Sequence, residues 1–164
     1  MSTEHRTFLG LVVKGDITRG KRAEQRPLEE LQPLLQAVLD DPTIIEFGWR
    51  QYTPYFADGD VCEFGVHGLW FRTDIDDEDA STWDLEVFGH PSLGEEPGTW
   101  DETARDYVVG PYEGPDKARY ERCRNLASAI TDSAFEHVLL AAFGDHAQVT
   151  VRKDGIEVET YEHE

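Results

Sequence analysis

The residues of this chain that could do chemistry are carboxylates and histidines. Asp58 and Asp60 flank Gly59 in a turn, and His146 follows Asp145 directly after a predicted helix. Carboxylate oxygens and imidazole nitrogens bind divalent metals in hydrolases, so Asp58, Asp60 and His146 are candidate ligands of a metal-dependent hydrolase. This hypothesis requires two turns that are distant in sequence to meet. An Asp-His pair just past a helix end is also typical of a simple cap and turn.

A run of acidic residues, Asp74-Ile-Asp76-Asp77-Glu78-Asp79, has the composition of a calcium loop. It lacks the glycine and the distal glutamate that such a loop requires, so a solvated acidic turn is favoured. The chain contains no Gly-x-Ser-x-Gly elbow and no paired-cysteine motif. We therefore predict no nucleophilic catalysis and expect no cofactor. An enzyme remains an open alternative, because carboxylate sites often have no linear signature.

The negative charge is concentrated in one part of the chain. Of the formal net charge of −19, residues 74–113 supply −12, with 13 acidic residues and Arg105 as their single base. Residues 1–73 are net −3, and their only basic cluster comprises Lys14, Arg19, Lys21, Arg22 and Arg26. Affinity for nucleic acid comes from cations that displace counterions, so direct nucleic-acid binding through the acidic region is excluded. A basic protein partner is the expectation that this charge favours.

An aromatic loop lies beside this charge. Tyr52, Tyr55 and Phe56 fall in a connection where Pro54 and Asp58-Gly59-Asp60 supply the turn chemistry. These rings either anchor the loop on the core or form a recognition surface. Together the loop and the acidic run define the candidate partner-binding residues: Tyr52, Tyr55, Phe56, Asp58, Asp60, Asp74, Asp76, Asp77, Glu78 and Asp79.

The elements that must position these residues begin with an antiparallel strand pair. Apolar and polar residues alternate along 43–51 and again along 61–72. Opposed residues must share a face, and one register buries the apolar set of both strands. This register sets Trp49 against Phe64, Phe47 against Val66, Arg50 against Glu63 and Glu46 against His67.

The other elements follow from periodicity and turn signals. Helical spacing predicts helices over 27–39 and 115–143, and Asp154-Gly155 predicts a hairpin over 147–161. Short strands are expected at 84–88 and 107–109, and residues 7–13 read as a strand or a helix. The fold class is therefore α+β: an antiparallel sheet of two hairpins plus the 84–88 strand, with helices on one face. We expect one domain over 1–164, with an acidic, loop-rich insertion at about 73–114.

Two segments resemble an uncharacterised group of small bacterial and phage proteins. The segment Trp49-Arg-Gln-Tyr-Thr-Pro-Tyr-Phe-Ala-Asp-Gly-Asp-Val-Cys-Glu-Phe64 is similar to an aromatic–Pro–aromatic–acidic-Gly stretch of that group. Phe143-Gly-Asp-His146, followed by a Val-rich hairpin, is similar to its ending. The resemblance covers about 27–71 and 135–164 and implies that these regions form one fold. It implies no activity and no catalytic residues.

Three functional hypotheses follow. The favoured one is a non-enzymatic interaction module, in its sharper form an inhibitor or immunity-type protein whose carboxylates imitate phosphates in a basic cleft. The alternatives are the metal-dependent hydrolase and a phage-related structural or accessory protein. No apolar run approaches the length of a membrane span, and Cys62 and Cys123 lie in apolar patterns typical of free buried thiols. A cytoplasmic location is therefore expected.

Overall fold

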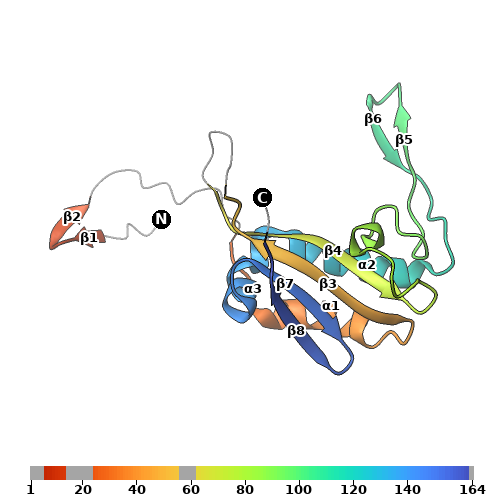
Figure 1. The fold of residues 1–164 in the computed structure, drawn as a ribbon. Coiled ribbons are helices and arrows are strands. Elements are labelled where there is room, and N and C mark those ends of the chain that lie inside the picture. Colours follow the sequence, from red (N-terminus) through yellow and green to blue (C-terminus); the bar gives the residue numbers. More distant parts are fainter. Residues whose placement is uncertain (1–5, 14–23, 56–61, 163–164) are drawn as a thin grey trace.

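A four-stranded antiparallel sheet forms the centre of the computed structural model, which describes residues 6–13, 24–55 and 62–162 (Figure 1). Its strand order is β4 (Gly65–Thr73), β3 (Ile44–Tyr52), β7 (Ala147–Arg152), β8 (Gly155–Thr160). The two predicted hairpins are therefore confirmed, and β3 and β7 join them. The α+β class expected from the sequence is also confirmed.

Three helices pack on one face of this sheet, the helix face (Figure 1). They are α1 (Leu28–Leu39), α2 (Lys117–Thr131) and α3 (Glu136–Phe143), with the 3₁₀ turn η2 (Ser133–Phe135) between the last two. Both predicted helical regions are confirmed, although the second bends at Asp132. Among the described residues no single helix is long and apolar enough to cross a membrane; only α2 and residues 133–143 taken together reach that composition, across a bend of 66°.

The predicted register of the first hairpin is wrong. Phe47 lies opposite Phe71, and Arg50 lies opposite His67 rather than Glu63. Gly68 has a φ of +64°, and the ladder shifts register beside it, between Gly48 and Arg50. A bulge of this kind reverses the alternation of side chains. Strict alternation therefore fails beyond Val66, and Trp70 points to the face opposite the helices.

The second face of the sheet, the open face, is covered by described residues only at one end. Trp70 and Leu85 are buried there, outside the main apolar cluster. Trp70 is covered by the 3₁₀ helix η1 (Thr82–Leu85), to which Leu85 belongs and whose N-cap Ser81 accepts a hydrogen bond from the Trp83 amide. The predicted 84–88 strand is wrong, because only Glu86 forms a bridge, with Trp70. At this point the segment is held by the burial of side chains around η1 and not by the backbone hydrogen bonds of a strand.

Two further hairpins complete the described chain. β5 (Gly98–Asp101) and β6 (Asp106–Val109) form an arm that stands clear of the sheet (Figure 1). The predicted strand at 107–109 is confirmed as part of β6, whereas β5 falls in a stretch predicted as loop. Near the N-terminus β1 (Arg6–Phe8) and β2 (Leu11–Val13) flank a turn at Leu9 and Gly10, both with positive φ. The 7–13 run is thus extended, as a hairpin rather than one strand.

Candidate interaction surface

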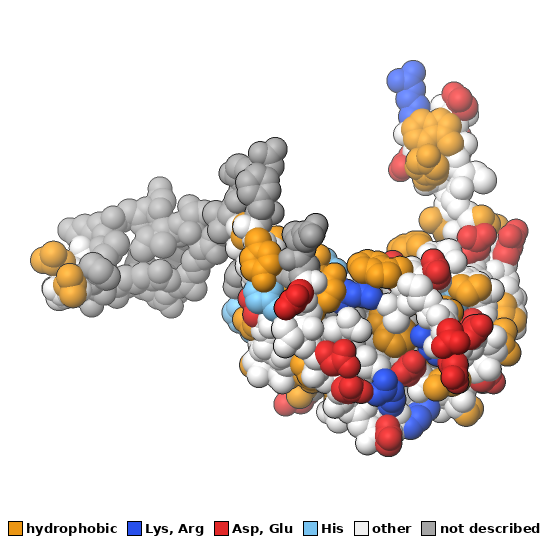
Figure 2. Space-filling view, in the orientation of Figure 1, with side chains coloured by type: hydrophobic (Ala, Val, Ile, Leu, Met, Phe, Trp, Pro, Cys, Tyr) orange, Lys and Arg blue, Asp and Glu red, His pale blue; other side chains and the backbone are white. Residues whose placement is uncertain are grey.

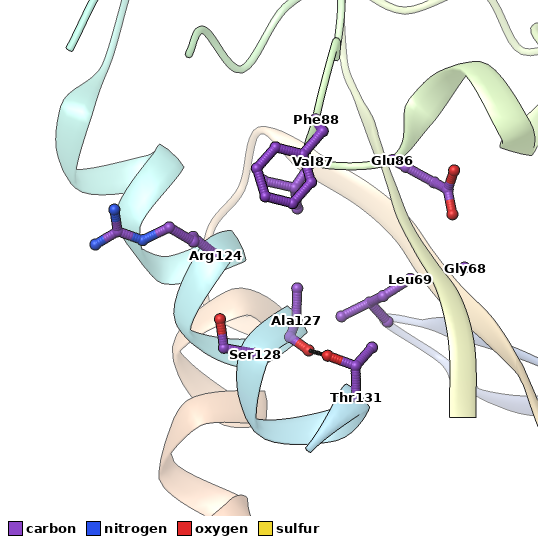
Figure 3. A pocket seen from close by; sticks show the side chains of 9 residues that line it. All are labelled: Gly68, Leu69, Glu86, Val87, Phe88, Arg124, Ala127, Ser128 and Thr131. Atoms are coloured by element: carbon purple, nitrogen blue, oxygen red, sulfur yellow. Dashed lines mark hydrogen bonds between the residues drawn. The ribbon is translucent and has the colours of Figure 1, made fainter. Parts of the chain in front are cut away.

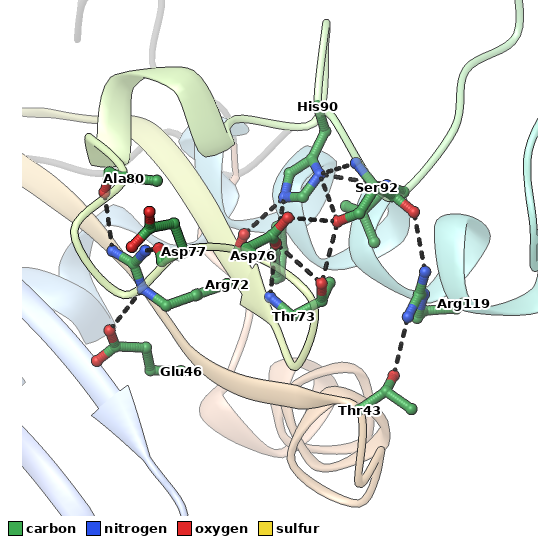
Figure 4. Close-up of polar contacts among 12 residues, drawn as sticks. Thr43, Glu46, Arg72, Thr73, Asp76, Asp77, Ala80, His90, Ser92 and Arg119 are labelled. Atoms are coloured by element: carbon green, nitrogen blue, oxygen red, sulfur yellow. Dashed lines mark hydrogen bonds and ion pairs between the residues drawn. The ribbon is translucent and has the colours of Figure 1, made fainter.

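The acidic turn at residues 74–80 is held in shape from beneath by one arginine. Arg72 is 6% exposed, and its Nη1 and Nη2 donate to the carbonyls of Asp77 and Ala80, the latter at 3.0 Å (Figure 4). Its Nε donates to Glu46 Oε1 at 3.0 Å. A buried guanidinium that donates to carbonyls and to a carboxylate fixes the orientation of these groups and neutralises the charge of the carboxylate. The turn therefore presents its acidic side chains from a fixed backbone.

The predicted acidic residues divide into two groups in this turn. Asp74, Asp77, Glu78 and Asp79 are exposed, as the partner-binding hypothesis requires. The Asp76 side chain is only 4% exposed and accepts hydrogen bonds from the Thr73 amide at 2.8 Å and from Ser92 Oγ at 2.8 Å (Figure 4). Burial would raise the pKa of Asp76, but these hydrogen bonds outweigh it and hold the pKa below its ordinary value. Asp76 thus ties the turn to the fold and is not available to a partner.

Asp76, His90 and Ser92 have the composition of a catalytic triad without its geometry. His90 Nε2 donates to the Phe71 carbonyl at 2.6 Å, while Nδ1 accepts from the amides of Ser92 and Leu93 (Figure 4). The Ser92 hydroxyl donates to Asp76 at 2.8 Å, and its longer contact of 3.3 Å with His90 Nδ1 meets a nitrogen that already accepts from two amides. A triad needs the imidazole to take the serine proton while the carboxylate holds its other nitrogen. Both imidazole nitrogens are committed to backbone groups, so the cluster is structural.

The arm formed by β5 and β6 has one apolar face that no described residue covers. Trp100 lies opposite Tyr107, and their rings meet edge-to-face at 5.3 Å. Val109 shares this face, and the three side chains are 52%, 69% and 65% exposed. Figure 2 shows the arm with its orange apolar groups standing above the body. An isolated two-stranded hairpin is marginal in water, so an exposed apolar face on one is typical of a binding element.

The tip of the arm is acidic. Asp101 lies opposite Asp106, and each carboxylate accepts hydrogen bonds from nearby amides: Asp101 from Thr103 and Ala104, and Asp106 from Tyr107. These bonds offset the repulsion of two like charges placed directly opposite each other. The arm therefore combines rings on one face with carboxylates at its end.

A small pocket of about 230 Å³ lies between the insertion and α2 (Figure 3). Leu69, Val87 and Ala127 supply apolar lining, and Phe88, which is 89% exposed, stands at its edge. The polar groups around it belong to Gly68, Glu86, Arg124, Ser128 and Thr131. The Thr131 hydroxyl donates a hydrogen bond to the Ala127 carbonyl at 2.6 Å. A pocket of this size accommodates one apolar side chain of a partner.

Next to this pocket an arginine is buried on the open face. Arg50 is 4% exposed, its Nη2 donates to Thr82 Oγ1 at 2.6 Å, and Trp83 lies over its guanidinium at 3.9 Å. Arg50 Nη1 and Trp70 Nε1 are buried without a hydrogen-bond partner in the described part of the chain. The indole of Trp83 is itself largely exposed. Stacking on a cation fixes this ring in place as a flat apolar surface.

The aromatic loop predicted from the sequence, like the acidic turn, contains both anchoring and exposed side chains. Tyr52 is half-buried between His67 and Tyr161, with ring centroids at 4.8 and 5.6 Å. Tyr55 is exposed and stacks on His146 at 5.1 Å. Tyr52 is therefore an anchor and Tyr55 an accessible ring. Phe56, Asp58 and Asp60 lie outside the described residues.

The turn at Asp145 meets the start of the aromatic loop, as the metal hypothesis required. Asp145 accepts hydrogen bonds from the Thr53 amide at 2.8 Å and from Thr53 Oγ1 at 2.7 Å. It also caps the amide of His146, whose φ is +53°. Within residues 6–13, 24–55 and 62–162, no cluster of three or more His, Cys, Asp or Glu could hold a metal ion. The site of Asp58, Asp60 and His146 stays a prediction.

No protein-family model, no characterised protein and no solved structure matches this chain. The resemblance to small bacterial and phage proteins therefore also stays a prediction, and the functional argument depends on the geometry alone. Sequence reasoning missed β5, Arg50, Trp83, His90 and Ser92. Of these, β5 carried a usable signal, because its Trp100 and the Tyr107 of the predicted strand flank an acidic turn as in a hairpin.

Proposed function

We propose that this protein is an interaction module that binds a basic protein through its acidic insertion, residues 74–113. One observation carries the proposal. The segment that holds −12 of the net charge also exposes seven large apolar side chains: Ile75, Trp83, Phe88, Trp100, Tyr107, Val108 and Val109. Acidic surface alone is a solubility device, whereas charge combined with exposed rings is typical of recognition surfaces.

The geometry supports a division of labour within this surface. Carboxylates attract a basic partner and speed its capture, while buried apolar anchors slow its release. The arm supplies Trp100 and Tyr107 as rings that can be buried by a partner, and the pocket beside Phe88 receives one of the partner's side chains. Because aromatic side chains dominate interface energies, the arm is the expected energetic centre.

A neutralised variant tests the electrostatic half of the proposal. The variant carries four substitutions that remove exposed charges: Asp74→Asn, Asp77→Asn, Glu78→Gln and Asp79→Asn. The side chain at position 77 keeps the oxygen that accepts a hydrogen bond from the amide of residue 79. The control removes four exposed charges elsewhere: Glu24→Gln, Glu29→Gln, Asp132→Asn and Glu162→Gln. Proteins are captured from a lysate of the organism that encodes the chain, at low and at high salt. We expect a salt-sensitive partner that the control retains and the variant loses.

The apolar half of the proposal is tested with an arm variant that carries both Trp100→Ser and Tyr107→Ser. The control is Leu140→Ser, at an exposed apolar side chain on α3. Once the captured protein is purified, its dissociation rate is measured against each variant. Loss of a central aromatic anchor costs about 2 kcal/mol or more, which raises the dissociation rate about 30-fold. Equal dissociation rates for the arm variant and the Leu140 variant would remove the arm from the proposed interface.

A further inference from the structure

The helix face carries an apolar groove of about 620 Å³ between α1 and α3. Trp49 lines it from β3, Leu28 and Leu35 from α1, and Val138 and Phe143 from α3. Leu28 is more than half exposed, although it begins an apolar helix stripe. The lining is almost entirely carbon, which is typical of a surface that another element covers.

The groove exists because the helical layer stops short of the sheet edge. Ile156 and Val158 of β8 lie opposite Val151 and Val149, so all four side chains share the helix face. The two β7 valines are buried, whereas Ile156 and Val158 are about half exposed. α3 has only eight residues, about 12 Å of helix, and cannot shield both strands. Within the described part of the chain, no further element covers Ile156 and Val158.

The same chain offers an element of the right kind. In the β1–β2 hairpin Leu9 is 86% exposed and Leu11 is 73% exposed, and Val12 is also exposed. Leu9 and Gly10 form a tight turn with positive φ, so the apolar side chains are presented on a short, preformed hairpin. Two uncovered apolar surfaces therefore exist in one polypeptide.

The connection to the hairpin leaves the body beside the groove. Gln25 Nε2 donates to the Ser133 carbonyl at 2.7 Å, and Gln25 Oε1 accepts from the His137 amide at 3.0 Å. The Arg26 amide donates to the Ala134 carbonyl at 2.8 Å. These anchors adjoin Val138, which lines the groove. Residues 14–23 separate Val13 from the anchored segment, and ten residues reach at most about 33–36 Å, well beyond the length of α3.

Charge favours the same pairing. Residues 1–26 hold six basic and three acidic residues, net +3, whereas residues 27–164 hold nine basic and 31 acidic residues, net −22. The N-terminal segment is therefore cationic, whereas the rest of the chain taken together is strongly acidic. Opposite charges at contact distance attract, and a short connection holds the hairpin at millimolar effective concentration.

We propose that the β1–β2 hairpin docks into the groove between α1 and α3 of its own chain and completes the helix face. Leu9 and Leu11 supply the apolar contact with the exposed lining residues Leu28 and Ile156. The docked hairpin competes with any external apolar ligand for the groove. A second copy of the chain and an unrelated protein are the other occupants that the tests distinguish.

The first test uses Leu11→Asp in the full chain. A charge in the groove prevents docking, so amide hydrogen exchange in α1 and α3 should become about tenfold faster, because docking protects what it covers. The control is Ile75→Asp, an equal change at an exposed side chain in the acidic turn, which should leave these rates unchanged. Unchanged exchange in the Leu11 variant overturns the proposal.

The second test traps the docked state without a destabilising substitution. Leu11→Cys is combined with Gln32→Cys, an exposed residue of the groove wall, in a Cys62→Ser background. The control pair is Leu11→Cys with Glu78→Cys in the acidic turn. We expect the intrachain disulfide to form about tenfold faster in the groove pair than in the control pair. In the groove pair it should form more slowly at about 1 M salt, because the Debye length falls to about 3 Å and the attraction between charges is screened. Equal rates in the two pairs overturn the proposal, and linked dimers assign the groove to a second copy instead.

Discussion

The sheet with its helices buries its aromatic residues, whereas the acidic insertion exposes residues of the same kind. Trp49 and Trp100 illustrate the contrast: the first is fully buried, with its Nε1 donating to Gln51 Oε1 at 2.9 Å, and the second is half exposed on the arm. Gln51 in turn donates to the carbonyls of Leu139 and Gly144, which ties α3 to β3. The body uses aromatic rings to exclude water. The insertion leaves the rings of Trp83, Trp100 and Tyr107 exposed.

The two regions also treat charge differently. In the body, Glu46 bridges Arg72 and Arg152 across three strands, and Asp41 binds Arg122 at 2.6 Å. In the insertion most carboxylates have no cation beside them in the described structure, and backbone amides hold Asp101 and Asp106. Paired charges rigidify a fold, whereas unpaired ones create a field. The paired charges of the body support the fold, and the unpaired charges of the insertion are those on which the proposed binding depends.

The largest expected effect compares the two tryptophans directly. Trp49→Ala leaves a cavity in the core and an unpaired Gln51, so the free energy of unfolding should fall by about 3–5 kcal/mol. Trp100→Ala removes an exposed ring and should change it by no more than about 0.5 kcal/mol. Urea unfolding monitored by circular dichroism measures both. Similar losses for the two variants would mean that the arm is part of the folded core.

A second comparison concerns two arginines that share Glu46. Arg72→Met leaves Glu46 and two carbonyls without a buried donor, at an expected cost of about 3 kcal/mol. Arg152→Met breaks a contact to the same carboxylate from a half-exposed side chain and should cost at most about 1 kcal/mol. Thermal unfolding at constant pH reports both. If the costs were equal, burial would not be what makes Arg72 important.

The anchoring of the insertion should make stability depend on pH. Burial holds the pKa of His90 below its ordinary value, so the unfolded chain takes up a proton near pH 6.5 that the folded chain resists. The free energy of unfolding should therefore fall between about pH 7.5 and 5.5, and fall again near pH 4 and below as Asp76 is protonated. His90→Gln should flatten the first decline.

Urea midpoints measured across this pH range provide the test, with His137→Gln at an exposed position as the control. Burial also lowers the pKa of His67, so part of the slope stays in the His90 variant. A slope that is identical in wild type and His90→Gln would contradict the network.

The smallest effect is a difference in thiol reactivity. Burial raises the pKa of Cys123 to about 12, so its thiolate is scarce and shielded at neutral pH. Cys62 is half-buried beside β4, and both cysteines are free. A thiol-specific dye should label one site per native chain and two after unfolding. Cys62→Ser should abolish native labelling; labelling that survives this substitution would show that the core around α2 opens.

Much of the fold was predictable because it depends on local patterns. Helical spacing of apolar residues predicted α1 and the α2–α3 region, and the Val-rich run around Asp154-Gly155 predicted β7 and β8. The actual turn is one residue earlier, at Lys153 and Asp154, with Gly155 already paired to Arg152. The exposed acidic side chains of residues 74–79 were also predictable, except for Asp76. In each correct case, neighbours in sequence supply the interaction.

The errors have one physical origin, which is contact between segments distant in sequence. Alternation predicts a register only while it is unbroken, and the bulge at Gly68 moved Trp70 to the open face. Residues 84–88 read as a strand because their pattern contains no information about how η1, which includes Leu85, packs over Trp70. His90 and Ser92 read as loop residues because their partners, Phe71 and Asp76, lie 16 to 19 positions away.

By itself the sequence determined the fold class, the positions of most helices and strands, and the gathering of negative charge in residues 74–113, because hydrophobic periodicity and charge are local properties. Only the tertiary structure decided that Asp76 faces inward while its neighbours face outward. It likewise decided that Trp100 and Tyr107 form one uncovered face, and that the helix face ends in an unfilled groove. Those outcomes depend on which surfaces long-range packing leaves exposed.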